Sequence, residues 1–92
     1  MSPDRVWRVD FFAEAARELR KLGPAAEKLI LRYLRQRIAV AEDPRRFGRP
    51  LTGDLKDLWR YRVGDYRIVA SIEDDRFVVL VVTAGHRREV YD

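Results

Sequence analysis

A chain of 92 residues that is 47% apolar, has a net charge of +4 and lacks cysteine can form one domain, but no disulfide and no cysteine-built zinc site. With one histidine and no histidine–carboxylate cluster, the sequence predicts no metal site and no cofactor. The start lacks the apolar stretch of a secretory signal, and the longest apolar run, residues 77–82, is too short to span a membrane, so we expect one cytoplasmic domain over residues 1–92.

The first half of the chain predicts a strand followed by a helical hairpin. Residues 7–11 alternate between apolar and polar side chains, as a half-buried strand does. A helix should begin at about residue 12 or 13, and Gly23-Pro24 should end it and start a second helix over about residues 25–42. The expected buried stripes are Phe12, Ala16, Leu19 and Leu22 in the first helix and Ile30, Tyr33, Leu34, Ile38 and Ala41 in the second.

Residues 45–56 predict a loop, because two glycines and Pro50 interrupt any regular pattern. Phe47, Leu51 and Leu55 are expected to anchor this loop to the core. Positive charge is concentrated in this loop and the segment that follows it, since residues 45–67 hold seven basic and three acidic side chains. This concentration favours a polyanionic partner.

The next segment predicts a β-hairpin, in which residues 58–63 and 66–73 are joined by the two-residue turn Gly64-Asp65. A two-residue turn fixes the register, so Arg62 should lie across from Arg67. Because side chains alternate across a strand, the apolar residues share one face and the arginines share the other. The apolar face is expected to hold Trp59, Tyr61, Ile68, Ala70 and Ile72, and the opposite face Arg60, Arg62 and Arg67.

A second tight turn at Asp74-Asp75 should lead to a last strand over residues 76–84, which is apolar on both faces and therefore central. In this register Arg67 pairs with Val82. The first strand must then join an edge, beside the last strand. The sequence thus predicts an α+β fold in the order strand-helix-helix-strand-strand-strand, with a two-helix hairpin on the apolar face of a roughly four-stranded, mainly antiparallel sheet and an open arginine face.

Two arginines directly opposite each other repel, at a cost of up to about 1 kcal/mol. A carboxylate elsewhere in the fold is one way to neutralise Arg62 and Arg67. An anion supplied by a partner is the other, and phosphate is the leading candidate because guanidinium groups fork toward its oxygens.

Gly85 permits a bend after the last strand, so His86, Arg87 and Tyr91 are expected to gather near these arginines. Together these side chains would suit binding of a phosphodiester and stabilisation of a pentacovalent transition state.

Two motifs resemble the RelE branch of the RelE/ParE toxin superfamily. They are Leu-Trp-Arg-Tyr-Arg-Val-Gly-Asp-Tyr-Arg-Ile at residues 58–68 and Gly-His-Arg-Arg-Glu-Val-Tyr at residues 85–91. The resemblance extends over nearly the whole chain, including the opening strand, the helix end at residues 18–22 and the segments at residues 43–45 and 51–53. It implies a toxin of a bacterial or archaeal toxin–antitoxin pair that enters the ribosome and cuts messenger RNA by attack of a ribose 2′-hydroxyl on the adjacent phosphate, without a metal.

By motif position, the resemblance implies that Arg67 and Arg87 clamp the scissile phosphate and that Tyr91 stacks on or orients a nucleotide. Arg62 stands, like Arg60, where cleaving members have lysine, and arginine hardly accepts a proton. His86 is therefore the best candidate for proton transfer, with Glu89 as a weaker one. Further contacts to RNA or the ribosome are expected from Arg45, Arg46, Arg49, Lys56, Arg60 and Arg88.

Two alternatives remain: a non-catalytic ParE-like toxin that inhibits DNA gyrase, and an inactive toxin fold kept as a binding module. A cognate antitoxin protein is implied in every case. We expect it to bind the apolar edge of the helical hairpin and an open edge of the sheet.

Overall fold

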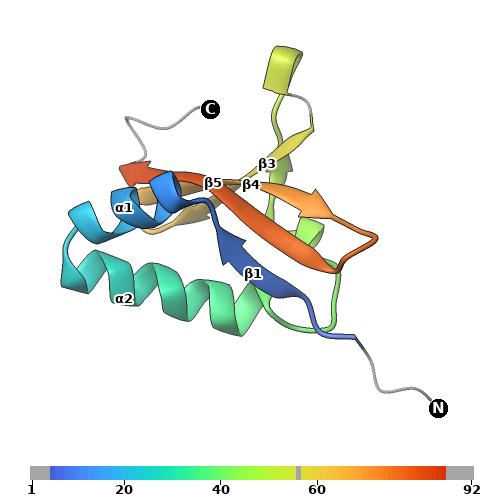
Figure 1. The fold of residues 1–92 in the computed structure, drawn as a ribbon, viewed down its shortest axis with the longest axis horizontal. Coiled ribbons are helices and arrows are strands. Elements are labelled where there is room, and N and C mark those ends of the chain that lie inside the picture. The colour runs from blue at the N-terminus through green and yellow to red at the C-terminus, as the bar shows by residue number, and fades with distance from the viewer. Residues whose placement is uncertain (1–4, 56, 87–92) are drawn as a thin grey trace.

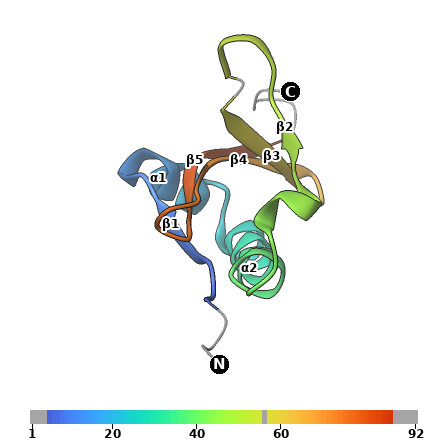
Figure 2. The same cartoon turned by 90° about the vertical axis from the view of Figure 1, so that its right-hand side faces the viewer.

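The computed structural model describes residues 5–55 and 57–86, which form a twisted five-stranded sheet with two helices on one side (Figures 1 and 2). The strand order is β1-β5-β4-β3-β2, with β1 parallel to β5 and all other neighbours antiparallel. The elements are β1 (Arg8–Phe11), α1 (Ala13–Lys21), α2 (Pro24–Tyr33), β2 (Arg49–Pro50), β3 (Leu58–Val63), β4 (Tyr66–Glu73) and β5 (Val78–His86). This is the expected α+β fold, with the first strand beside the last.

Helix α1 buries a narrower stripe than the sequence predicts. Ala15 and Leu19 are buried, whereas Phe12 is 49% exposed. The Phe12 N–H still donates to the Val81 carbonyl of β5 at 3.0 Å, so this residue has the extended backbone of β1. Strand alternation then turns Phe12 away from the core that Phe11 faces. The prediction that Phe12 belongs to the buried helix stripe is therefore wrong.

The second helix ends earlier than residue 42. Helix α2 is followed by a π-helical turn over Leu34–Ile38, and the chain leaves helical geometry at Ala39. The next carbonyl, that of Val40, accepts a hydrogen bond from the Trp7 N–H at 2.9 Å. This tertiary bond takes the backbone out of the helix, and it leaves Ala41 exposed rather than in the expected stripe.

The segment expected as a loop contains a short edge strand. Strand β2 pairs with β3, with Arg49 across from Arg60 and Pro50 across from Trp59. Short 3-10 turns flank it at Pro44–Phe47 and Gly53–Leu55. Leu51 is buried as an anchor should be, but Phe47 is 39% exposed, so the prediction that it anchors the loop in the core is wrong.

The β3–β4 hairpin has the register that its turn predicts. Arg62 lies across from Arg67, and Trp59 lies across from Ala70. Gly64 has a φ of 60°, a left-handed value that glycine adopts without strain. The turn chemistry therefore fixes the positions of both arginines.

The β4–β5 pairing differs from the prediction at its turn. The connection has four residues, 74–77, because Glu73 pairs with Val78. Phe77, with a φ of 54°, turns its ring against Trp7, and the two ring centroids are 4.9 Å apart. This contact with the start of β1 draws Phe77 out of the strand in which the sequence placed it.

A β-bulge changes the register further along the same pair. Ala70 pairs with Val81 but Val69 pairs with Thr83, so Val82 is the extra residue. The longer turn and the bulge together bring Gly85 across from Arg67. The predicted pairing of Arg67 with Val82 is wrong for these two reasons.

Glu18 of α1 holds the strand just beyond the bulge. Its Oε1 accepts hydrogen bonds from the Thr83 hydroxyl at 2.8 Å and from the Ala84 N–H at 3.0 Å. These bonds connect helix α1 to β5 at the point where the bulge shifts the register of the strand.

The core lies between the helices and the predicted apolar face of the sheet. Tyr61, Ile68 and Ala70 are fully buried there, and Trp59 and Ile72 pack against its margin. The other face is less open than expected, because Val69 and Leu51 on it are also buried. Arg60, Arg62 and Arg67 therefore lie on a face of the sheet that is partly covered.

Candidate nucleic-acid interface

Four arginines lie on one face of three adjacent strands. Arg67 of β4 pairs with Arg62 of β3, and Arg60 of β3 pairs with Arg49 of β2. Cross-strand partners share a face, and Arg60 and Arg62 are two positions apart, so all four side chains leave the sheet on the side away from the helices. We call this set, Arg49, Arg60, Arg62 and Arg67, the arginine row.

The members of the arginine row differ in exposure. Arg67 is only 8% exposed, Arg60 is half-buried, and Arg49 and Arg62 are exposed. Within the part of the chain that the structure describes, Arg49 and Arg62 make no ion pair. The row thus combines one buried arginine with two that face solvent.

A pocket opens beside the exposed end of the row. It has a volume of about 270 Å³ and is lined by Phe47, Arg49, Arg60 and Arg62. Three guanidiniums around so small a space create a strong positive potential, which suits a phosphate group.

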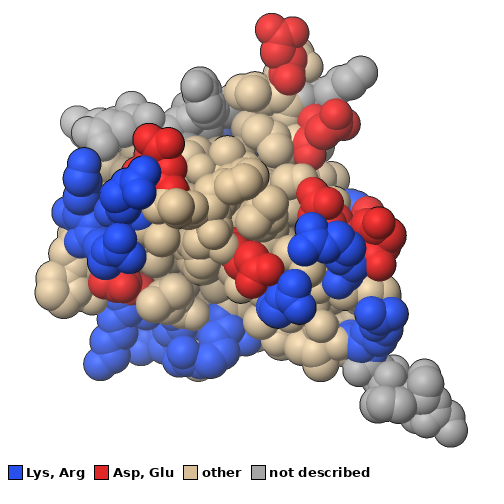
Figure 3. Space-filling view, viewed as in Figure 1, with Lys and Arg blue, Asp and Glu red and all other residues tan. Residues whose placement is uncertain are grey.

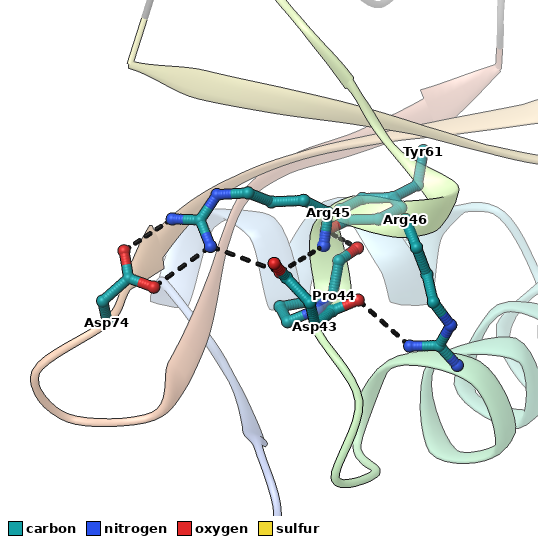
Figure 4. A network of polar contacts seen from close by, with 6 residues as sticks. All are labelled: Asp43, Pro44, Arg45, Arg46, Tyr61 and Asp74. Atoms are coloured by element: carbon teal, nitrogen blue, oxygen red, sulfur yellow. Dashed lines mark hydrogen bonds and ion pairs between the residues drawn. The ribbon is translucent and has the colours of Figure 1, made fainter.

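The segment before β2 is fixed by a polar network (Figure 4). The buried Tyr61 hydroxyl donates to the Pro44 carbonyl at 2.9 Å, and burial raises the pKa of Tyr61. Arg45 donates to the carboxylate of Asp43 and, through two nitrogens, to that of Asp74 in the β4–β5 turn. The hydrogen bonds from Arg45 lower the pKa of Asp74.

This network engages Arg45 and Arg46, two residues that the sequence predicts to contact RNA. The charge of Arg45 is neutralised by two carboxylates, and its guanidinium lies 5.6 Å from the centroid of the Trp59 ring. Arg46 donates to the Asp43 carbonyl at 3.0 Å and lies 4.5 Å from the centroid of the Phe47 ring. Both arginines brace the segment that presents Phe47, and RNA contact by either stays a prediction.

His86 lies apart from the arginine row. It pairs with Tyr66, and the two rings meet edge to face with centroids 5.9 Å apart. Since Tyr66 alternates with Arg67, this position is on the helix side of the sheet. The expected gathering of His86 beside Arg62 and Arg67 is wrong, because the longer turn and the bulge shifted the register.

Several other predicted site residues lie outside the described residues. They are Lys56, Arg87, Arg88, Glu89 and Tyr91. In contrast, sequence reasoning missed Phe47 as part of the site. The signal was present, because Phe47 is an aromatic residue within the basic run Arg-Arg-Phe-Gly-Arg at residues 45–49.

Basic side chains also cover the outer surface of the helical hairpin (Figure 3). Arg32, Arg35 and Arg37 are exposed there. Acidic side chains lie among the basic ones on this face, as Figure 3 shows, so it is a mixed solvated surface. The arginine row differs because three of its members, Arg49, Arg60 and Arg62, line one small pocket.

An apolar groove of about 480 Å³ lies between β1 and the end of the helical hairpin. Its apolar lining comes from Val6, Trp7, Val9, Phe11, Leu31, Leu34 and Ala39, and Arg8 and Arg35 contribute charge. The groove runs beside the outer edge of β1, where the sheet ends.

Residues 5–55 and 57–86 contain no group of three potential metal ligands. No helix within these ranges is long and apolar enough to cross a membrane.

Comparison with known proteins identifies the family. A family model described as the ParE toxin of the type II toxin–antitoxin system parDE matches residues 9–91. The chain belongs to the RelE/ParE toxin superfamily. This toxin is 32% identical over 91 residues to toxin RelE of Mycobacterium tuberculosis, covering 99% of this chain and 92% of the relative.

Further similarities lie in the RelE branch. The toxin is 32% identical over 87 residues to the mRNA interferase toxin RelE of Escherichia coli, covering 90% of this chain and 87% of that one. Its structure is similar to the toxin–antitoxin complex RelBE2 of Mycobacterium tuberculosis, with a TM-score of 0.76 and 28% identity over 89% of this chain and 99% of that one. The isolated E. coli RelE toxin, at 24% identity and a TM-score of 0.67, shares the fold over 87% of this chain and 83% of that one.

Proposed function

We propose that this toxin is a ribosome-dependent messenger-RNA endoribonuclease. The arginine row carries the proposal, because four arginine side chains leave the sheet on one face, where guanidinium groups suit a phosphodiester backbone. The similarity to a toxin named as an mRNA interferase supports the same reaction class.

In the proposed reaction a ribose 2′-hydroxyl attacks the adjacent phosphorus, and the bond from phosphorus to the 5′-oxygen of the next nucleotide breaks. The products are a 2′,3′-cyclic phosphate and a free 5′-hydroxyl. Negative charge builds up on the phosphoryl oxygens in the transition state, where a fixed cation lowers the barrier most. Arg67 suits this role because it is buried, and Arg62 lies directly across from it.

Proton transfer requires a group other than the arginines of the row. Arginine does not give up its proton in proteins, so Arg62 and Arg67 supply charge alone. Proton transfer by His86 stays a prediction. His86 lies across from Tyr66, on the face of the sheet opposite to the arginine row. Arg87 and Tyr91 are proposed, from the motif at residues 85–91, as the further clamp on the phosphate and the support for the nucleotide.

Mapping transcript ends after brief induction tests the proposal. Translated messages should acquire new ends in the wild type, but not in the double variant Arg67→Ala/Arg87→Ala, and a variant at the exposed Arg32 should cut normally. His86→Ala should slow cleavage with near-normal ribosome affinity if this residue moves a proton. Intact messages during growth arrest by the wild type would exclude the nuclease.

The family model named for ParE supports a second candidate, a ParE-like toxin that inhibits DNA gyrase without cleaving RNA. Such a toxin should induce a DNA-damage response while messages stay whole. The same induction experiment therefore separates the two candidates.

A cognate antitoxin is proposed as the partner, supported by the similarity to toxin–antitoxin complexes. The outer edge of β1 offers it backbone groups, since the N–H groups of Arg8 and Phe12 point inward to β5 and those of Val9 and Phe11 alternate outward. An extended segment can pair with this edge and lay apolar side chains in the adjoining groove. Arg67→Ala/Arg87→Ala should leave antitoxin affinity largely intact, because Arg67 lies on the other face of the sheet and does not line that groove.

A further inference from the structure

We propose that the pocket of Phe47, Arg49, Arg60 and Arg62 is a nucleotide subsite, which holds one residue of single-stranded RNA next to the phosphate bound at Arg67. We call it the Phe47 subsite. The inference rests on the proposed function, and it adds where a nucleotide beside the scissile phosphate binds and which side chains bind it.

The geometry of the sheet connects the subsite to the phosphate site. Arg62 lines the pocket and also lies across from Arg67, so it belongs to both places. Along β3, Arg60 and Arg62 are two residues apart, which is about 7 Å. An RNA backbone that leaves Arg67 can therefore meet Arg62 first, and then the pair of Arg60 and Arg49.

Phe47 completes the pocket as an aromatic wall. The backbone just after it is pressed against the core, because a Cβ added at Gly48 would lie 3.0 Å from the Tyr61 ring. The Tyr61 hydroxyl also holds the Pro44 carbonyl. With the chain fixed on both sides, the Phe47 ring stays 39% exposed at the pocket.

Two guanidinium groups lie against the Phe47 ring. Arg46 and Arg37 lie 4.5 Å and 5.3 Å from the centroid of the Phe47 ring. An exposed aromatic ring held among cations is the arrangement on which proteins stack bases of single-stranded nucleic acid while binding their phosphates. An acidic protein segment would use the arginines but gain little from Phe47, so we assign the pocket to RNA.

Binding of 2′-O-methyl hexaribonucleotides to the full chain tests the subsite, because these oligonucleotides lack the attacking hydroxyl and stay uncut. Affinity is measured by fluorescence anisotropy over a salt series, with circular dichroism as the check on folding. The variants are Phe47→Ala, Phe47→Tyr and Arg49→Gln. Arg20→Gln, at an exposed position on α1, is the matched control.

Substitutions of Phe47 and of Arg49 should affect the affinity for RNA and its salt dependence differently. Phe47→Ala should weaken binding about 5- to 100-fold without changing the salt dependence, and Phe47→Tyr should restore it. Arg49→Gln should reduce the slope of log affinity against log salt by about 0.7, the value for one lost phosphate contact on a single strand. Arg20→Gln should change neither quantity.

Unchanged affinity in Phe47→Ala, or an unchanged salt slope in Arg49→Gln, would overturn the subsite, as would a wild type that does not bind the oligonucleotide. A Phe47→Ala variant that loses antitoxin but keeps RNA would show a protein-docking site instead. A wild type that binds the oligonucleotide through Phe47 but leaves messages intact in cells would refute the nuclease and keep the subsite.

Discussion

Replacing Arg62 by glutamine should make the folded toxin more stable while weakening the proposed cleavage of messenger RNA. Arg62 lies directly across from Arg67 on the neighbouring strand, and both side chains are always charged. Like charges in this arrangement cost about 0.2–1 kcal/mol. Glutamine keeps the polarity and much of the length of the side chain, so Arg62→Gln removes the repulsion with little change in packing.

The magnitude follows from the exposure of the two side chains. Arg67 is buried but Arg62 faces solvent, which screens the pair, so we expect a gain of about 0.3–0.8 kcal/mol in the free energy of unfolding. In a domain of this size 1 kcal/mol corresponds to about 4–8 °C, so Tm should rise by about 1–6 °C. The proposed cleavage of messages should fall sharply in the same variant, Arg62→Gln.

Urea unfolding at two salt concentrations is the assay. The screening length falls from about 10 Å at about 0.1 M salt to about 3 Å at about 1 M, so the gain should shrink at the higher concentration. Arg35→Gln, at an exposed helix position, should show no comparable gain. A less stable Arg62→Gln, or a gain that high salt leaves intact, would refute the reasoning.

Substitutions at three other positions probe the framework around the site. Tyr61→Phe leaves the Pro44 carbonyl without its buried donor and should cost about 1–3 kcal/mol in urea unfolding. Glu18→Ala removes two hydrogen bonds to β5 and should cost a similar amount, whereas Glu18→Gln, which keeps an acceptor oxygen, should cost less; thermal unfolding of both variants measures the difference. Asp74→Asn should cost less than about 1 kcal/mol, since the ion pair is exposed. Because Arg45 lowers the folded pKa of Asp74 below 3.8, this contribution is present above the unfolded pKa and lost as the pH falls through the folded value, so unfolding curves of wild type and Asp74→Asn should converge at acid pH.

The parts of the fold that local chemistry determines were predictable from the sequence. A glycine with positive φ in a two-residue turn sets the β3–β4 register, and strand alternation then assigns every side chain of that hairpin to a face. The cross-strand position of Arg62 and Arg67 follows from these two facts. The helical hairpin was predictable for a similar reason, since Gly23-Pro24 interrupts two periodic segments.

The differences arise where distant residues act on the backbone. The β4–β5 turn is longer because Phe77 packs on Trp7, and the extra residue Val82 precedes a segment that Glu18 holds. Neither contact leaves a periodic signal in the local sequence. The longer turn shifts the pairing by two residues and keeps each side chain on its face, whereas the one-residue bulge moved His86 to the helix side of the sheet. The arginines of the hairpin were unaffected, because their register depends on their own turn.

Strand β2 was missed for a different reason. Its two residues, Arg49 and Pro50, are too few to show alternation, and proline is depleted in strands. The strand exists because it pairs with β3, and the Leu51 N–H extends the pairing by donating to the Leu58 carbonyl at 3.0 Å. Without it Arg49 would not lie across from Arg60, and the pocket beside Phe47 would lack one wall.

The proline in β2 gives the two rims of the sheet opposite characters. Since Leu51 directs its N–H inward to β3, alternation places Pro50 with its missing donor on the outside, where a foreign strand would need one. The rim at β1 has no such block. Continuous edge-to-edge association of sheets requires two receptive rims on each molecule, and here one of them lacks a donor at Pro50. Free copies of the toxin that associate through their backbones should therefore favour pairs joined across β1.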